Sequence, residues 1–249
     1  MSTIAIVAVP ETQTRQWNRI VELFVAPARL FEDVLRDGSW WLPFVLTVVC
    51  SLCMTLSAAY RVGFREMAIN SIRSDPGNAA ILDPGAPAEQ RDAVIRTTET
   101  TFKISAASTP FLILLYNALY ALTLWCGLNI ISGGRAQFGA IFAVLLYADL
   151  IQDVRAILGT IVLYVLPDPG NFNIQNPFGS NLGYYLGSDF PSWLRTFFET
   201  MDGLTIWYLA LIALGCSVVA RTKRSSAAGL VFGIWLFIVF ARITWALIA

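Results

Sequence analysis

The sequence predicts an all-α, polytopic membrane protein with five transmembrane helices, preceded by interfacial helices near the N-terminus. Hydrophobic residues make up 56% of the 249 residues and charged residues only 14%, whereas a soluble domain carries about 25% charged residues. The mean hydropathy is +0.62. The apolar residues gather into stretches long enough to cross a bilayer, which takes roughly 20 residues. A chain of this composition has too little polar surface to keep itself in water.

The composition also excludes several classes of function. The chain contains no histidine, which excludes Ser-His-Asp hydrolysis, histidine general bases and ordinary zinc or haem sites. Lys plus Arg equals Asp plus Glu at 17 each, so no net positive field is present to attract nucleic acid. We therefore expect no enzyme activity, no cofactor, no metal and no nucleic-acid partner.

Residues 1–39 are predicted to form a cytoplasmic or interfacial amphipathic segment. Within residues 15–37, Pro27 is suited to the first turn of a helix. One face of that helix is apolar and the opposite face is charged, as the two sets Leu30, Phe31, Val34, Leu35 and Arg29, Glu32, Asp33, Arg36 indicate. Such a helix either lies in the membrane interface or docks on the cytoplasmic ends of the bundle, and the sequence favours neither.

Residues 40–249 are predicted to form the membrane domain. Its five spans are expected at about residues 40–60, 106–132, 137–166, 204–220 and 227–249. Two Asp-Pro-Gly turns follow the first span, at 75–77 and 83–85. From Ala88 onward a run without proline predicts a helix that extends the second span out of the membrane.

The distribution of Lys and Arg predicts the orientation. The turn 221–225 holds three cations and is expected in the cytoplasm, whereas the loop 167–203 has Arg195 against Asp168, Asp189 and Glu199 and is expected outside. With five spans, the N-terminus is then cytoplasmic and the C-terminus lies outside. Arg61 and Arg65 run against this pattern, because they follow the first span on the outer side.

Two features resemble catalytic motifs. Cys50 and Cys53 form a C-x-x-C, but they lie in an apolar span without partner cations, so we interpret them as apolar filler. Asp149 and Asp202 could each stand at membrane depth, as in intramembrane aspartyl proteases. The Gly-x-Gly-Asp signature of those proteases is absent before Asp202, and we expect Asp202 to cap the fourth span instead.

A polar cluster interrupts the third span. Asp149, Gln152 and Asp153 share one helix face by their spacing, while Arg155 points elsewhere. Each charge at mid-membrane costs roughly 2.5–3.5 kcal/mol unless it is paired or hydrated. One interpretation is an ion, proton or headgroup site in a polar cavity. The other, which we favour, is a broken or tilted helix whose charges pair with each other, with Arg242 of the fifth span or with the interface. The candidate polar site comprises Asp149, Gln152, Asp153, Arg155, Asp202 and Arg242.

The chain resembles the Yip-domain family, the Ypt/Rab-interacting membrane proteins and their bacterial relatives. The resemblance rests on residues 23–31 running into Trp40-Trp41-Leu42-Pro43, on Phe138-Gly139-Ala140 and Tyr147-Ala148, on Asn173-Ile174-Gln175-Asn176-Pro177 with Asn181, and on residues 202–207. The Asp-Leu-Tyr-Gly-Pro type signature of eukaryotic members is absent, which favours the bacterial branch and the inner membrane. Relatives often have a proline where Ile151 stands, so the resemblance implies a helix break there.

Together these observations predict a non-enzymatic membrane protein of the Yip type that acts through protein or lipid contacts in the bilayer, in membrane organisation or a trafficking-like role. Its partners are membrane lipid and proteins, a second copy included, because small residues permit close helix packing. Those small residues are Gly203, Ala210, Gly215, Gly229 and Gly233. The alternative is a small transporter or channel that uses Asp149, Asp153 and Arg155. A water-filled cavity at Asp149 would favour transport, and a packed ion pair would favour the structural interpretation.

Overall fold

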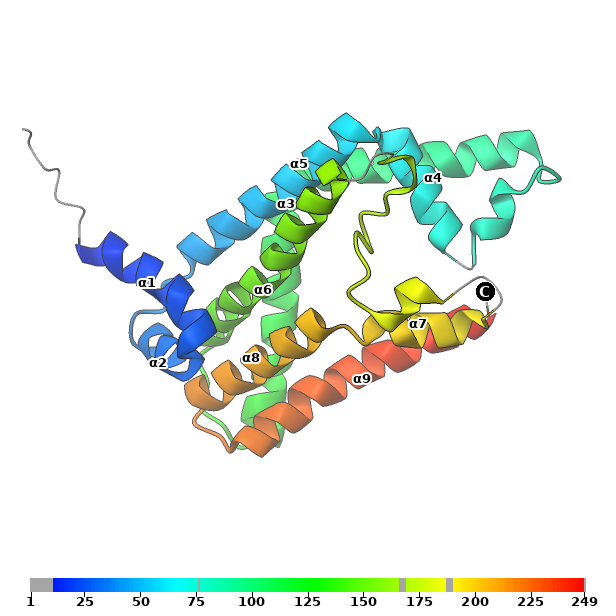
Figure 1. Cartoon of the computed structure of the whole chain (residues 1–249). Helices are drawn as coiled ribbons and strands as arrows, with labels where there is room; N and C mark the ends of the chain where they lie inside the picture. The colour runs from blue at the N-terminus through cyan, green and yellow to red at the C-terminus, as the bar shows by residue number, and fades with distance from the viewer. Residues whose placement is uncertain (1–10, 76, 166–168, 187–189, 249) are drawn as a thin grey trace, which may run out of the picture.

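The computed structural model describes residues 11–75, 77–165, 169–186 and 190–248, and every regular element in these ranges is a helix (Figure 1). Residues 1–10 of the predicted N-terminal segment lie outside them. The long helices are α3 (Trp41–Arg61), α5 (Ala88–Cys126), α6 (Phe138–Val165), α8 (Gly203–Val219) and α9 (Arg224–Ile248). Shorter ones are α1 (Glu11–Val25), α2 (Pro27–Asp37), α4 (Phe64–Ser74), α7 (Ser192–Thr200), the 3-10 turns η1 (Ala79–Leu82), η3 (Pro169–Asn171) and η4 (Leu182–Tyr185), and the π-helical turn η2 (Gly127–Ile131).

Three stretches of the described chain are long and apolar enough to cross a membrane: Trp41–Arg61, Ala88–Ile131 and Arg224–Thr244. The all-helical membrane fold is therefore confirmed, as is the extension of the second span from Ala88. Helix α8 is apolar but has only 17 residues. Helix α6 has 28 residues, and it carries the three charged residues of the polar cluster near its middle. The count of five spans stays a prediction.

The connections between the long helices gather at two ends of the molecule (Figure 1). At one end, the Arg135 amide before α6 donates to the Ala220 carbonyl after α8 at 3.2 Å. At the other end, the Asn70 amide group of α4 donates to the Phe172 carbonyl beyond α6 at 3.1 Å. The long helices thus run between these two ends, which the sequence predicts to lie on opposite membrane faces.

Arg61 and Arg65, which ran against the charge pattern, are both engaged at the second of these ends. The Arg61 guanidinium lies 5.2 Å from the Tyr164 ring centroid and donates to the Tyr164 carbonyl at 3.3 Å. The Arg65 guanidinium pairs with the Asp92 carboxylate at 3.5 Å. These local contacts explain the presence of Arg61 and Arg65, whichever side of the membrane they lie on.

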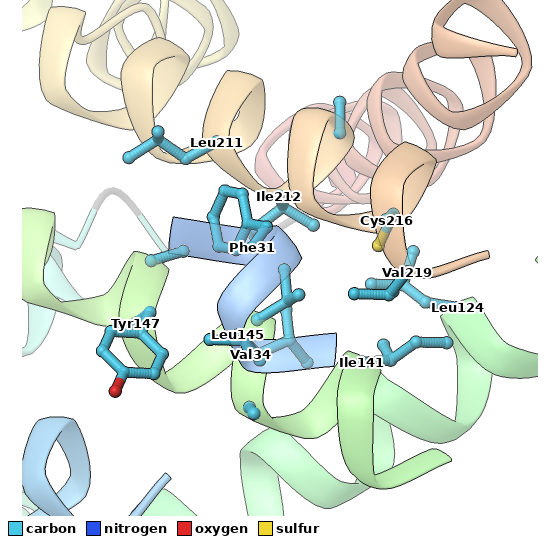
Figure 2. Packing of buried hydrophobic residues seen from close by; sticks show 14 of the residues in the cluster. Phe31, Val34, Leu124, Ile141, Leu145, Tyr147, Leu211, Ile212, Cys216 and Val219 are labelled. Atoms are coloured by element: carbon cyan, nitrogen blue, oxygen red, sulfur yellow. The ribbon is translucent and has the colours of Figure 1, made fainter. Parts of the chain in front are cut away.

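Helix α2 docks on the bundle with its apolar face, as Figure 2 shows. Pro27 opens the helix, and Gly38 closes it in the left-handed conformation with its amide donating to the Val34 carbonyl. Phe31 and Val34 are fully buried, in a cluster that also contains Ile212 of α8. Of the two placements that the sequence left open, docking on the bundle is therefore the observed one.

Helix α6 forms the centre of the core, because most of its residues from Ala140 to Ile151 are buried. It is an unbroken α-helix from Phe138 to Val165. The predicted break near Ile151 is wrong. An isoleucine keeps the backbone N–H that proline lacks, so the helical hydrogen bonds can continue through this position.

The small residues have different surroundings. An added Cβ at Gly215 would lie 2.5 Å from a Val144 methyl group, so this glycine permits close contact of α8 with α6. By contrast, a Cβ at Gly203, Gly229 or Gly233 would meet nothing within 4 Å. The Gly229-x-x-x-Gly233 motif therefore packs against nothing in the described part of this chain.

Candidate functional site in the membrane helices

The face of α6 that carries Asp149, Gln152 and Asp153 turns toward α3 and α5. Asp149 is 8% exposed and Asp153 is 5% exposed, so both carboxyl groups are removed from the molecular surface. Buried carboxyl groups require hydrogen-bond donors or ionic partners. The identity of those partners decides which of the two interpretations the geometry favours.

Asp149 receives its donor from α5. The Asn117 side-chain amide donates to Asp149 Oδ2 at 2.8 Å and also to the Ile113 carbonyl at 3.0 Å. The Tyr208 phenol of α8 lies near the same carboxyl group. Asp149 thus connects three helices through neutral polar groups.

Asp153 receives its donor from α3, where the Thr47 hydroxyl donates to Asp153 Oδ2 at 2.9 Å. Hydrogen bonds between membrane helices stabilise their packing by about 0.6–2 kcal/mol each. Neither Asp149 nor Asp153 has an ion-pair partner among the described residues. The expected pairing of these charges with each other or with Arg242 is therefore not what the described structure contains.

A pocket of about 300 Å³ reaches both carboxyl groups between α3, α5 and α6. Polar side chains from all three helices line it, together with the apolar residues Leu112 and Ile113 of α5. The polar lining residues are Thr47, Ser51, Tyr116, Asn117, Asp149, Gln152 and Asp153. A water-filled cavity at Asp149 is the observation that would favour transport. This pocket lies at that position, and its filling with water stays a prediction.

Arg155 lies on another side of α6 and pairs with Asp202. Its Nη2 lies 3.1 Å from Asp202 Oδ1 and 3.1 Å from the Thr205 hydroxyl oxygen. Asp202 Oδ1 also accepts from the Leu204 amide at 2.7 Å, and the Ser180 hydroxyl donates to Oδ2. The predicted N-cap of the fourth span is confirmed. Because Asp149 and Asp202 are held by separate partners, they do not form the dyad of an aspartyl protease.

Arg242 lies at a second pocket, of about 940 Å³, which Arg155 also lines. In this pocket α7 contributes Glu199, whose pKa is raised by burial against the opposing influence of Arg195 and Arg242. The six predicted site residues thus divide into two groups. Asp149, Gln152 and Asp153 line the first pocket, and Arg155, its partner Asp202, and Arg242 belong to the second.

The partners of the two carboxyl groups were not predicted from the sequence. Asn117 was detectable in principle, because an asparagine in an apolar span is costly unless it is bonded. Thr47 carries no comparable signal. Cys50 and Cys53 are free thiols, as are Cys126 and Cys216, and the described residues contain no group of three potential metal ligands.

The Yip1 domain matches residues 21–246 of the chain. The match runs from within α1 to the last turn of α9 and includes both pockets. A comparison with curated proteins gives no match, and a comparison with solved structures gives none either.

Proposed function

Because the chain belongs to the Yip1 domain family, we propose that this integral membrane protein is non-enzymatic and acts through protein or lipid contacts in the bilayer, in membrane organisation or a trafficking-like role. We place it in the bacterial branch of the family and in the inner membrane, with the N-terminus cytoplasmic and the C-terminus outside. The family and the apolar helices support the membrane location, and the charge pattern of the loops supports the orientation.

The main support for a role through contacts is that the buried polar groups bond to neighbouring helices of the same chain. Asp149 bonds to α5, Asp153 to α3, and Arg155 to the start of α8. Each of these groups is bonded to a different helix, and Arg155 lies apart from the pocket that Asp149 and Asp153 share. The outer faces of α5 and α9 are rich in exposed apolar side chains, such as Phe111 and Phe240, which lipid or a partner helix can cover.

The proposal is tested by extracting the protein in polymer nanodiscs and identifying the proteins and lipids that stay with it by mass spectrometry. We expect enriched partners on the wild type and their depletion on Phe240→Ala, because Phe240 is 70% exposed on α9. Asp149→Asn is the control, since its side chain is buried away from that face. Equal partner profiles for wild type and Phe240→Ala would contradict a contact role for this face. Turnover of a lipid or peptide by the purified protein would contradict a non-enzymatic role.

A small transporter or channel is the second candidate, and the pocket of about 300 Å³ at Asp149 and Asp153 favours it. A carboxyl group inside a membrane helix that faces a polar cavity is typical of ion pathways. In proteoliposomes, this candidate predicts ion flux that Asp149→Asn abolishes while the variant remains folded. Ser51→Ala is the matched control, because it alters the same pocket without removing a charge. Absence of flux in the wild type would contradict this candidate.

A further inference from the structure

The second pocket has a volume of about 940 Å³. This volume lies within the range of about 300–1,000 Å³ that is typical of small-molecule pockets. It lies between α4, α6, α7, α8 and α9 and the chain that leads from α6 to α7. Its lining combines arginines and side-chain amides with an apolar wall on α9. The principal lining residues are Arg155, Asn176, Arg195, Trp235, Ile238 and Arg242.

Arg155 and Arg242 both line this pocket, and each has N–H groups without an acceptor among the described residues. Arg155 uses Nη2 for Asp202 and Thr205, while its Nε is buried without a hydrogen-bond partner among the described residues. Arg242 is exposed and has no ion-pair partner within 4.0 Å in the described part of the chain. Planar guanidinium groups bind phosphate oxygens in a forked geometry.

The apolar wall belongs to the same helix as Arg242. Ile238 stands one helical turn before Arg242, and Phe237 is the neighbour of Ile238 in the sequence. The apolar wall therefore extends from Arg242 toward the N-terminal end of α9. Phe237 is 72% exposed and Ile238 is 49% exposed. Arg242 lies in the last two turns of α9 (Arg224–Ile248), and the apolar wall lies on the same helix, further from that end.

This arrangement matches a molecule with one phosphate and one long apolar tail. We propose that the pocket binds a phospholipid, with its phosphodiester at Arg155 and Arg242 and an acyl chain along Trp235, Phe237 and Ile238. The inference rests on the proposed function, because it names a lipid for contacts in the bilayer. The neighbouring Glu199 favours a phosphodiester, which carries a single charge, over a more highly charged phosphate group.

The test is native mass spectrometry of the detergent-solubilised protein, titrated with synthetic phosphatidylethanolamine. Diacylglycerol with the same chains and inorganic phosphate are the two comparison ligands. We expect Arg242→Gln to weaken phospholipid binding about ten-fold, which corresponds to about 1.4 kcal/mol, and Arg242→Lys to restore part of it. Arg224→Gln is the matched control, because Arg224 is an exposed arginine at the opposite end of the same helix.

Ile238→Trp is a second variant, which narrows the apolar wall without touching a charge and should also weaken phospholipid binding. Phospholipid affinity that is unchanged in both Arg242→Gln and Ile238→Trp would overturn the inference. Equal affinity for diacylglycerol would overturn the role of the phosphate, and inorganic phosphate binding as tightly as phospholipid would overturn the role of the chain. If these results appear while Phe240→Ala still depletes partners in nanodiscs, the phospholipid pocket fails and the proposed function stands.

Discussion

Replacing Gly215 by alanine will destabilise the protein, because this glycine lies where α8 meets both α6 and α2. The new Cβ would stand 2.5 Å from Val144 Cγ1, 3.1 Å from Val144 Cγ2 and 3.2 Å from Phe31 Cδ1. Distances below about 3 Å force atoms to move. Val144 is a fully buried, β-branched side chain with one strongly preferred rotamer in a helix, and Phe31 is fully buried as well. Either side chain can therefore move only within the interior of the protein.

The magnitude follows from two opposing contributions. Overpacking a tight core costs about 1–3 kcal/mol, while alanine in place of glycine favours a helix by about 1 kcal/mol. The variant Gly233→Ala isolates the second contribution, because a Cβ there meets nothing within 4 Å. The difference in the free energy of unfolding between the two variants therefore measures the overpacking alone, at about 1–3 kcal/mol.

The assay uses the thiol of Cys216, which is fully buried beside Gly215. With Cys50, Cys53 and Cys126 replaced by serine, a fluorogenic thiol reagent reports the temperature at which the core opens. One kcal/mol shifts the midpoint by roughly 2–4 °C for a chain of this size. We expect Gly215→Ala to melt below Gly233→Ala by roughly 2–12 °C. Equal midpoints for the two variants would refute the close packing of α8 on α6 and α2.

Three further predictions concern orientation, the cysteines and pH. In intact spheroplasts, an impermeant thiol reagent should label Gln175→Cys but not Ser225→Cys, in a background without native cysteines; the reverse pattern would invert the orientation. Replacing Cys50 and Cys53 together by serine should leave the unfolding midpoint nearly unchanged, and a metal lost with the two thiols would contradict their structural role. Burial raises the pKa of Glu199, so the docking of α7 should be firmest below its unfolded pKa and weaken as the pH rises through its folded pKa. Proteolysis of the α7 segment should follow that rise, and Glu199→Gln should abolish the dependence; a dependence that persists in this variant would assign it to another group.

The sequence predicted the helices well, because their apolar length and end signals are local. The segments that form α3, α6 and α9 were placed to within a few residues, and Pro27 correctly opened α2. What covers the apolar face of α2 was not predictable. An amphipathic pattern says that Phe31 and Val34 need an apolar partner, and lipid and the helix α8 satisfy that need equally well.

The candidate site was predicted only in part, because a local sequence pattern does not reveal contacts between distant segments. The i, i+3, i+4 spacing placed Asp149, Gln152 and Asp153 on one helix face, and all three line the same pocket. The hydrogen bonds of Asp149 with Asn117 and of Asp153 with Thr47 join residues that are 32 and 106 positions apart, which a local pattern cannot supply. The predicted break at Ile151 came from a proline in relatives, and a residue that retains its backbone N–H does not impose it.

Because α6 is unbroken, its surroundings must compensate more of the cost of burying Asp149 and Asp153 than they would beside a broken helix. Asp149 and Asp153 cost roughly 2.5–3.5 kcal/mol each as charges in the bilayer, and one cross-helix hydrogen bond recovers only about 0.6–2 kcal/mol. The two donors therefore leave part of the cost unmet. The pocket of about 300 Å³ beside them can hold several water molecules at about 30 Å³ each, and hydration from it would meet the remainder. A hydrated pocket is compatible with a structural role in helix packing and with ion passage. The ion flux of the Asp149→Asn variant, compared with that of the Ser51→Ala variant, therefore separates the contact role from the transport role.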